Sequence, residues 1–235
     1  MGADTQIAPR ALAEMELFRG LSATALDTVS ARARVRRLSR AQCIFNQGDE
    51  GVRVHAVIEG GVRIAQSGSD GAQVVIRFIG PGEMFGTVAI FTDGRYPADA
   101  TTLSETLEAS WSEAELLELM THYPQIAINV IRTIGKRLQE VQDRVRELAT
   151  QRAERRVAHA VLRLAQQAGH GTTRGTAIAF PLRRKDVADI SGTTLHTASR
   201  ILTAWGKAGL LVTHKQHLTI LQPAAILRIA EDAAD

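Results

Sequence analysis

The sequence has little of several features, and each shortage excludes a class of protein. The 235 residues contain a single cysteine, Cys43. No disulfide can therefore form within the chain, and an iron–sulfur cluster, which needs several thiolates, cannot be assembled. No apolar run approaches the about 20 residues that a membrane-spanning helix needs, and the N-terminus lacks the apolar core of a signal peptide. We therefore expect a cytoplasmic protein.

Acidic and basic residues are unevenly distributed along the chain. Residues 1–150 hold 16 Lys and Arg against 19 Asp and Glu, a net charge of −3, whereas residues 151–235 hold 12 against 6, a net charge of +6. Lys and Arg release counterions from a phosphate backbone. The C-terminal part is therefore where a nucleic acid is expected to bind.

The stretch Leu182–Leu211 has the pattern of two short helices joined by a tight turn. Gly192 permits the positive φ of such a turn, and the side-chain oxygen of Thr193 or Thr194 can cap the second helix. That helix would bury one apolar stripe and expose a face without acidic residues. The exposed face contains His196, Thr197, Ser199, Arg200 and Thr203. This pattern favours a DNA-reading helix-turn-helix over an ordinary helical hairpin.

A heptad pattern follows Pro124. Apolar residues recur there at alternating steps of four and three, at Ala127, Ile131, Ile134, Leu138, Val141, Val145 and Leu148. A helix of about 25 residues is roughly 38 Å long and cannot cover so narrow a stripe by itself. A second copy of the chain would cover it as a parallel coiled coil with two-fold symmetry. Packing against the rest of the same chain is the alternative.

Short apolar runs separated by glycine-rich turns predict a small β-sandwich or barrel between about residues 35 and 111. The expected strands are Cys43–Phe45, Val54–Ile58, Val62–Ala65, Val74–Ile79, Met84–Phe85, Val88–Phe91 and Leu107–Trp111. Residues 9–37 are expected to be helical and to pass into a strand over Arg34–Leu38. After a helix over Gln151–Gln167, a glycine-rich loop should precede a strand over Ala177–Phe180. A β-hairpin over 210–221 should follow the helix-turn-helix and make it a winged helix.

Taken in this order, the chain resembles the Crp–Fnr family of bacterial transcription regulators over nearly its whole length. The strongest local matches are QGDEG, IEGGVRI, IGPGEMFG and SGTTLHTASRIL. The resemblance implies an α+β fold with three parts. These are an effector-sensing, cupin-like β-barrel of the cyclic-nucleotide-binding type with N-terminal helices at 1–122, a dimerisation helix at 123–150, and a winged helix-turn-helix at 151–235. It also implies a homodimer on a palindromic operator in double-stranded DNA, with RNA polymerase as a further partner if the protein is an activator.

The resemblance assigns roles to residues of the recognition helix. Arg200 matches the arginine that ends the family's polar triplet, and its guanidinium can pair with O6 and N7 of guanine. His196 stands where the family commonly has glutamate, which leaves the base preference at that step open. The basic residues that begin the first helix are expected on phosphates. The expected DNA contacts are Arg200, His196, Ser199, Thr197, Thr194, Arg183, Arg184 and Lys185.

The effector pocket departs from the family members that bind cyclic AMP. Those members have a glutamate just after a barrel glycine, and an arginine followed by serine or threonine on the cyclic phosphate. Here the glycine is Gly86, the glutamate position is Thr87, and the arginine–serine position is Pro97–Ala98. Burying a phosphate without a guanidinium partner is costly, so we expect an effector other than a cyclic nucleotide. A cyclic-nucleotide-responsive regulator with atypical contacts is the alternative. The expected pocket residues are Gly86, Thr87, Tyr96, Pro97, Ala98 and His55.

The cofactor is left open. The segment FTDGRYPADA resembles regulators of nitrogen-oxide metabolism, some of which bind haem. A haem ligand here would be His55, the one histidine in an expected barrel strand, although a strand histidine is more often a packed residue. A cupin-type metalloenzyme would need two or three histidines that converge in the barrel, and the other six lie outside it. Without a catalytic motif, we expect neither an enzyme nor a metal site.

Overall fold

The computed structural model describes residues 7–69 and 73–231 and shows a mixed α/β chain, as predicted. The chain divides into two compact units, Met1–Gly71 with Ile79–Glu140, and Ala72–Phe78 with Val141–Asp235. The long helix α5 (Pro124–Thr150) contributes residues to both units. Across the described residues, no helix combines the length and the apolar character needed to span a membrane.

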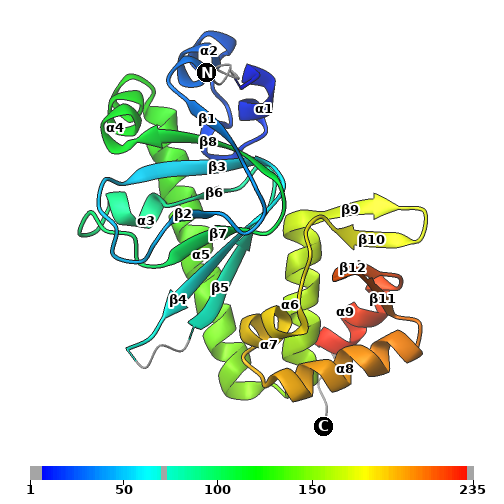
Figure 1. Cartoon of the computed structure of the whole chain (residues 1–235). Helices are drawn as coiled ribbons and strands as arrows, with labels where there is room; N and C mark the ends of the chain where they lie inside the picture. Colours follow the sequence, from blue (N-terminus) through cyan, green and yellow to red (C-terminus); the bar gives the residue numbers. More distant parts are fainter. Residues whose placement is uncertain (1–6, 70–72, 232–235) are drawn as a thin grey trace. The chain divides into compact units, whose positions relative to one another are not determined.

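Two antiparallel four-stranded sheets form the β domain (Figure 1), with strand orders β1-β8-β3-β6 and β2-β7-β4-β5. The strands are β1 (Arg34–Leu38), β2 (Cys43–Phe45), β3 (Arg53–Glu59), β4 (Val62–Ser67), β5 (Gln73–Ile79), β6 (Met84–Phe85), β7 (Asp99–Thr102) and β8 (Thr106–Ser112). Alternate residues along a strand point to opposite faces, and four consecutive residues are buried in each of β3 and β8, Val54–Val57 and Glu108–Trp111, so both faces of this sheet are covered. The sheets thereby enclose an apolar core.

Short helices close one side of the β domain. They are α1 (Pro9–Ala13), the 3-10 turn η1 (Glu16–Phe18), α2 (Ala23–Ala31) and α4 (Glu113–His122). The ring of Trp111 is fully buried there, with its Nε1 donating to the carbonyl of Val29 at 2.9 Å and Phe18 packed edge-on at 5.1 Å. Ser112 and Glu115 form a capping box that begins α4 directly after β8.

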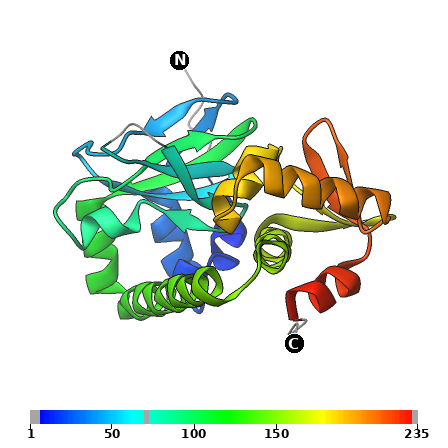
Figure 2. The same cartoon turned by 90° about the horizontal axis from the view of Figure 1, so that it is seen from below.

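The second unit contains a helical core and a small sheet. Its elements after α5 are α6 (Ala153–Ala168), β9 (Gly169–Thr172), β10 (Gly175–Ile178), α7 (Arg184–Ser191), α8 (Leu195–Lys207), β11 (Leu211–His214), β12 (His217–Ile220) and α9 (Pro223–Glu231). Figure 2 looks nearly along α6, with α8 on one side of it and α9 on the other. The sheet order is β11-β12-β10-β9, so the β11–β12 hairpin of the predicted winged helix is present.

Two local predictions were wrong. The apolar run Val88–Phe91 is not a strand, because Thr87–Ile90 forms the helix α3 after Gly86, which has a φ of +78°. Periodicity alone cannot separate so short a helix from a strand. The predicted glycine-rich loop instead forms β9 and the start of β10. Glycine is required there, since a Cβ at Gly169 would lie 2.1 Å from the carbonyl oxygen of Ala165. The strand β7 was not predicted.

The turn between α7 and α8 generates a prediction about stability. Gly192 has a φ of +63°, and a Cβ there would lie 2.3 Å from Cδ2 of Leu148. Because L-residues pay about 1–2 kcal/mol in the left-handed region, Gly192→Ala should lower the opening free energy of α7 and α8 by at least about that amount. Native-state hydrogen exchange of peptides from these helices measures it.

Gly206→Ala is the matched control in the same unit. Gly206 has no positive φ, and its nearest neighbour, the carbonyl oxygen of Leu211, would lie 4.0 Å from the added Cβ. This substitution should leave the protection of α8 unchanged or raise it by up to about 1 kcal/mol, the helix propensity gained over glycine. Equal protection in both variants would contradict the role given to the Gly192 turn.

Candidate functional site

The turn between α7 and α8 has the geometry of a helix-turn-helix. The left-handed Gly192 ends α7, and the backbone N–H of Thr193 donates to the carbonyl of Ala188 at 3.0 Å. Of the two candidate caps, Thr194 begins α8, because its side-chain oxygen accepts from the backbone N–H of Thr197 at 3.2 Å. A Cβ-free residue and a hydroxyl cap therefore set the angle between the two helices.

The predicted apolar stripe of α8 faces inward. Its buried residues are Ala198, Ile201, Leu202 and Trp205. The indole Nε1 of Trp205 donates to the carboxylate of Glu154 on α6 at 3.0 Å. This hydrogen bond fixes the rotation of α8 about its own axis, so that the opposite, polar face is directed outward.

Arg156 of α6 holds the end of α7 and was not singled out from the sequence. Its guanidinium donates to the carbonyls of Ser191 and Gly192, both at 3.0 Å, and to the carbonyl of Gln151 at 2.7 Å. These carbonyls would otherwise be unpaired at a helix end. Nothing in the sequence distinguishes Arg156 from its neighbour Arg155, so only the three-dimensional contacts identify it as a positioning residue.

The three basic residues that begin α7 are engaged within the chain. Arg183 pairs with the buried carboxylate of Asp186 at 2.8 Å, and Lys185 pairs with Asp189. Arg184 reaches α8, where it donates to the carbonyl of Ser199 at 2.6 Å and to the hydroxyl of Thr203 at 2.7 Å. Arg184 thus links the two helices. Ser199, a predicted base contact, accepts from the same guanidinium through its hydroxyl at 2.8 Å.

Arg200 and His196 lie on the exposed face of α8. Within residues 7–69 and 73–231, neither side chain makes a hydrogen bond or an ion pair. The first residue of α8, Leu195, is 50% exposed on the same helix and was not predicted as a contact. An exposed leucine that precedes His196 offers an apolar group suited to a thymine methyl.

The β11–β12 hairpin turns through Lys215 and Gln216, which have φ values of +46° and +69°. Two positive φ values are typical of a two-residue hairpin turn. The carbonyl of Gln216 accepts from the backbone N–H of Leu182 at 2.7 Å, just before α7. The exposed tip of the hairpin, which contains His214, Lys215 and His217, is therefore tied to the start of the helix-turn-helix.

The interior of the β domain contains a buried polar network around His55. The Nδ1 atom of His55 contacts the carboxylate of Glu108, and its Nε2 lies 3.1 Å from the hydroxyl of Tyr96. Arg36 donates to the other oxygen of Glu108 at 2.8 Å. The Tyr96 hydroxyl also accepts from the backbone N–H of Arg53 at 2.7 Å. Both ring nitrogens of His55 therefore have protein partners.

This network and its aromatic neighbours lie in the expected effector region. Tyr96 stacks on Phe45 with ring centroids 3.6 Å apart, and a Cβ at Gly86 would lie 3.1 Å from Cδ2 of His55. Gly86, Tyr96 and His55 therefore lie close together. Ala98 is also buried, whereas Pro97 is exposed. Pro97 and Ala98 stand at the sequence positions where the resemblance places the phosphate-binding arginine and its serine.

Thr87, at the glutamate position of the cyclic-AMP-binding members, is buried and contacts α5. Its hydroxyl accepts from Nη1 of Arg137 at 2.9 Å, and Nη2 of Arg137 donates to the carbonyl of Met84. The effector region and the long helix are therefore joined by one arginine.

His55 does not fit the role of a haem ligand. A ligating imidazole must present one nitrogen to the iron, and both nitrogens of His55 are already bonded within the core. In the part of the chain that the structure describes, no group of three or more His, Cys, Asp or Glu side chains is placed to hold a metal ion.

The predicted dimerisation stripe is exposed along α5. Ile126 and Val130 of this helix are buried in the core of the β domain. By contrast, the predicted stripe residues are between 45% and 69% exposed; these are Ile131, Ile134, Leu138, Val141, Val145 and Leu148. Contiguous apolar exposure of this kind is typical of an interaction surface.

Comparisons with known proteins agree with this organisation. The cyclic nucleotide-binding domain matches residues 35–123, and the Crp-like helix-turn-helix domain matches residues 155–229. The cyclic AMP receptor protein of Thermus thermophilus is 28% identical over 214 residues, which cover 91% of this chain and 96% of that protein. A CRP-like cAMP-activated global transcriptional regulator of Mycobacterium tuberculosis is 25% identical over 198 residues, which cover 84% and 88% of the two chains.

A solved structure shows the same fold. FixK2 from Bradyrhizobium japonicum superposes with a TM-score of 0.73 at 22% identity, covering 86% of this chain and 99% of that one. The β domain, long helix and helix-turn-helix therefore occur in the same order in a known protein.

The buried network generates a prediction about acid stability. Glu108→Gln should lower the free energy of unfolding of the β domain by about 3 kcal/mol at pH 7, because it removes the carboxylate from a buried ion pair. Burial alone would raise the pKa of Glu108, but the hydrogen bond and charge of His55 and the charge of Arg36 hold this pKa below its ordinary value. Urea unfolding followed by Trp111 fluorescence, in a Trp205→Phe background, measures the change.

The pH dependence follows from the lowered pKa. A carboxyl with a depressed folded-state pKa contributes stability above its unfolded-state pKa of about 4.3 and loses it as the pH falls through the folded-state value. The wild type should therefore lose more stability than Glu108→Gln between about pH 5 and pH 3. Glu105→Gln, which breaks an exposed ion pair with Arg37, should change little. Parallel acid profiles for wild type and Glu108→Gln would refute this account.

Proposed function

Because the chain belongs to the Crp–Fnr family of transcription regulators, we propose that it binds a palindromic operator in double-stranded DNA as a homodimer. The observation that carries this proposal is the exposed apolar stripe on α5, together with the exposed guanidinium of Arg200 on α8, which pairs with none of the residues that the structure describes. The relatives that match the chain are regulators rather than enzymes, and we propose no catalytic activity.

The stripe supports a dimer because its side chains stay 45% to 69% exposed against the residues that the structure describes. A second α5 in parallel would cover them in knobs-into-holes fashion. The contact would be isologous, with each residue near its own counterpart across the two-fold axis. The two copies of α8 would then enter successive major grooves about 34 Å apart.

The contacts on α8 support different roles for the predicted DNA-binding residues. Arg200 and His196 are proposed to read base edges, and Leu195 to pack against a thymine methyl. Thr194 and Thr197 are proposed to contact phosphate at the start of α8. Arg184 is proposed to position α8, because its guanidinium is already bonded to Ser199 and Thr203. Arg183 and Lys185 retain exposure for phosphate contacts.

The interior of the β domain supports an effector other than a cyclic nucleotide. The expected pocket positions hold a buried threonine, a proline and an alanine, and the space beside them contains Tyr96 and His55. A cyclic phosphate would lack the arginine that the resemblance assigns to it, because Pro97 and Ala98 stand at that position. The second candidate is a cyclic-nucleotide-responsive regulator with atypical contacts. It is favoured by the two matched relatives, because the names of both refer to cyclic AMP.

The dimer proposal predicts the effect of a charge in the stripe. Leu138→Glu should convert the dimer to monomers at micromolar concentration, because it places a carboxylate at the centre of an apolar seam. Sedimentation velocity measures the result. Leu117→Glu on α4 is the matched control, since Leu117 is also an exposed leucine, at 43% against 58% for Leu138. Dissociation in both variants, or in neither, would contradict the proposed seam.

The DNA proposal predicts a change in specificity. A duplex selected from a randomised pool by the wild type serves as the reference, with a scrambled duplex beside it. Arg200→Ala should weaken binding to the selected duplex about 10- to 100-fold, equivalent to one bidentate guanine contact. Binding to the scrambled duplex should change much less.

Lys185→Ala is the comparison variant for Arg200→Ala. Because Lys185 is proposed to contact phosphate, Lys185→Ala should weaken binding to both duplexes to a similar extent and reduce the salt dependence of binding. Fluorescence anisotropy at several salt concentrations measures both variants. Equal losses on both duplexes for Arg200→Ala would remove Arg200 from base recognition.

A further inference from the structure

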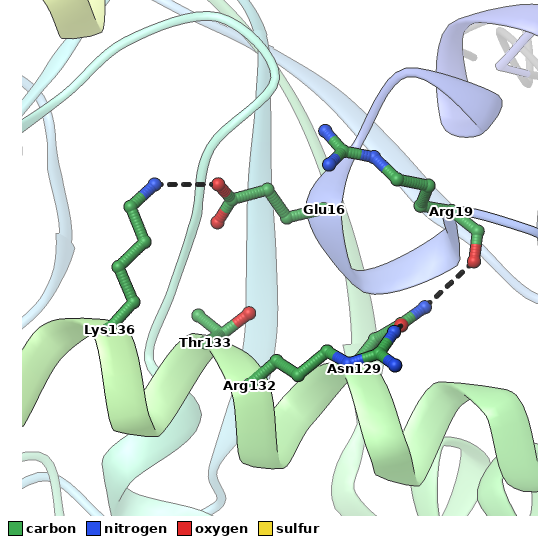
Figure 3. A pocket seen from close by; sticks show the side chains of 6 residues that line it. All are labelled: Glu16, Arg19, Asn129, Arg132, Thr133 and Lys136. Atoms are coloured by element: carbon green, nitrogen blue, oxygen red, sulfur yellow. Dashed lines mark hydrogen bonds and ion pairs between the residues drawn. The ribbon is translucent and has the colours of Figure 1, made fainter.

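A basic hollow lies between η1 and the first half of α5, outside the expected effector region. It is open to solvent, has a volume of about 120 Å³, and is lined by Glu16, Arg19, Asn129, Arg132, Thr133 and Lys136 (Figure 3). Its three cationic side chains face one carboxylate, so the lining has a formal net charge of +2. A cationic lining without a matching number of acids selects for anions.

The two walls of the hollow are joined by a buried amide. Asn129 is 4% exposed, and its Nδ2 donates to the carbonyl of Leu17 at 3.0 Å and to that of Arg19 at 2.9 Å. Figure 3 shows this link between α5 and the turn that carries Arg19. Gly20, with a φ of +83°, turns the chain directly afterwards. The position of the Arg19 backbone relative to α5 is therefore fixed before any ligand binds.

Several polar groups of the hollow have spare hydrogen-bonding capacity. Lys136 is paired with Glu16 at 2.7 Å. Arg132 makes only a long contact of 3.4 Å with the side-chain oxygen of Asn129. Among the described residues, the guanidinium of Arg19 and the hydroxyl of Thr133 make no hydrogen bond, and Figure 3 shows this hydroxyl directed into the space below Glu16.

The hollow and the proposed dimer seam lie on opposite faces of α5. Successive residues of an α-helix are rotated by about 100°. Asn129 and Lys136, seven residues apart, therefore share a face, whereas Ile131 and Leu138, each two residues further on, lie about 200° around the helix. A partner helix on the seam would leave the hollow open to solvent.

We propose that this hollow binds a small organic dianion, with its two negative charges on phosphoryl or carboxylate oxygens. The guanidinium groups of Arg19 and Arg132 can each pair with such oxygens through two parallel N–H donors. The Thr133 hydroxyl supplies a further donor, and the two charges of the ligand balance the net charge of the lining. The site is separate from the β-domain interior and does not depend on the proposed DNA contacts.

Isothermal titration calorimetry of the full chain tests the proposal, with inorganic phosphate and succinate as separate probes at constant ionic strength. Binding of phosphate alone would assign a phosphoryl ligand, and binding of succinate alone would assign a dicarboxylate. We expect Arg132→Ala to weaken binding of the successful probe at least about 10-fold, the effect of losing one charge-assisted hydrogen-bonding pair. Absence of heat with both probes up to about 10 mM would overturn the proposal.

Arg40→Ala is the matched control for this titration. Arg40 lies in the same unit, is exposed, and makes no hydrogen bond or ion pair to any residue that the structure describes. Arg40→Ala removes the same charge without changing the lining of the hollow. It should leave the affinity for the probe within about two-fold of the wild type, as expected for a distant, screened charge. Thr133→Val, which keeps the shape but removes the donor, should weaken binding several-fold. An equal loss in Arg40→Ala and Arg132→Ala would reduce the effect to general electrostatic attraction.

Discussion

The organisation of this protein depends on α5, because three faces of this one helix have three different environments. Ile126 and Val130 are buried in the core of the β domain, so the helix begins as part of that domain. The apolar stripe from Ile131 to Leu148 is exposed, and water is an unfavourable environment for so much contiguous apolar surface. A third face carries the basic hollow. The rotation of α5 about its own axis therefore decides which surface each of these features meets.

Arginine residues have two different roles in the helix-turn-helix unit: some bond within the chain, and others are exposed for DNA. The net positive charge of the unit does not show which arginine has which role. Arg156 and Arg184 use their guanidinium groups within the chain, to hold the end of α7 and to join α7 to α8. Arg200 uses none of its donors in this way. A basic composition thus reflects internal scaffolding as much as attraction for phosphate. The planar guanidinium, with five donors, suits both tasks.

Periodicity and spacing predicted the long-range organisation well. The heptad steps located α5, and Gly192 with a cap at Thr193 or Thr194 located the helix-turn-helix, because these signals come from repeated burial or from a required backbone conformation. The short elements α3 and β9 were missed, since a few apolar or glycine residues fit several structures equally well. The residues named from the sequence for DNA and effector contacts stay predictions. The contact between His55 and Glu108 could not be predicted, because the two residues are 53 positions apart in sequence and meet only through the pairing of β3 with β8.

The hydrogen bond between Thr87 and Arg137 couples the position of α3 in the β domain to that of the long helix α5. Arg137 immediately precedes Leu138, so the residue that is anchored to α3 and the residue at the middle of the stripe share one peptide bond. Arg137 is also anchored to the carbonyl of Met84, at the start of the segment that leads into α3. A displacement of α3 would therefore be transmitted through Arg137 to the middle of α5 and would rotate this helix about its axis. A rotation of only a few degrees there would move both ends of the stripe together.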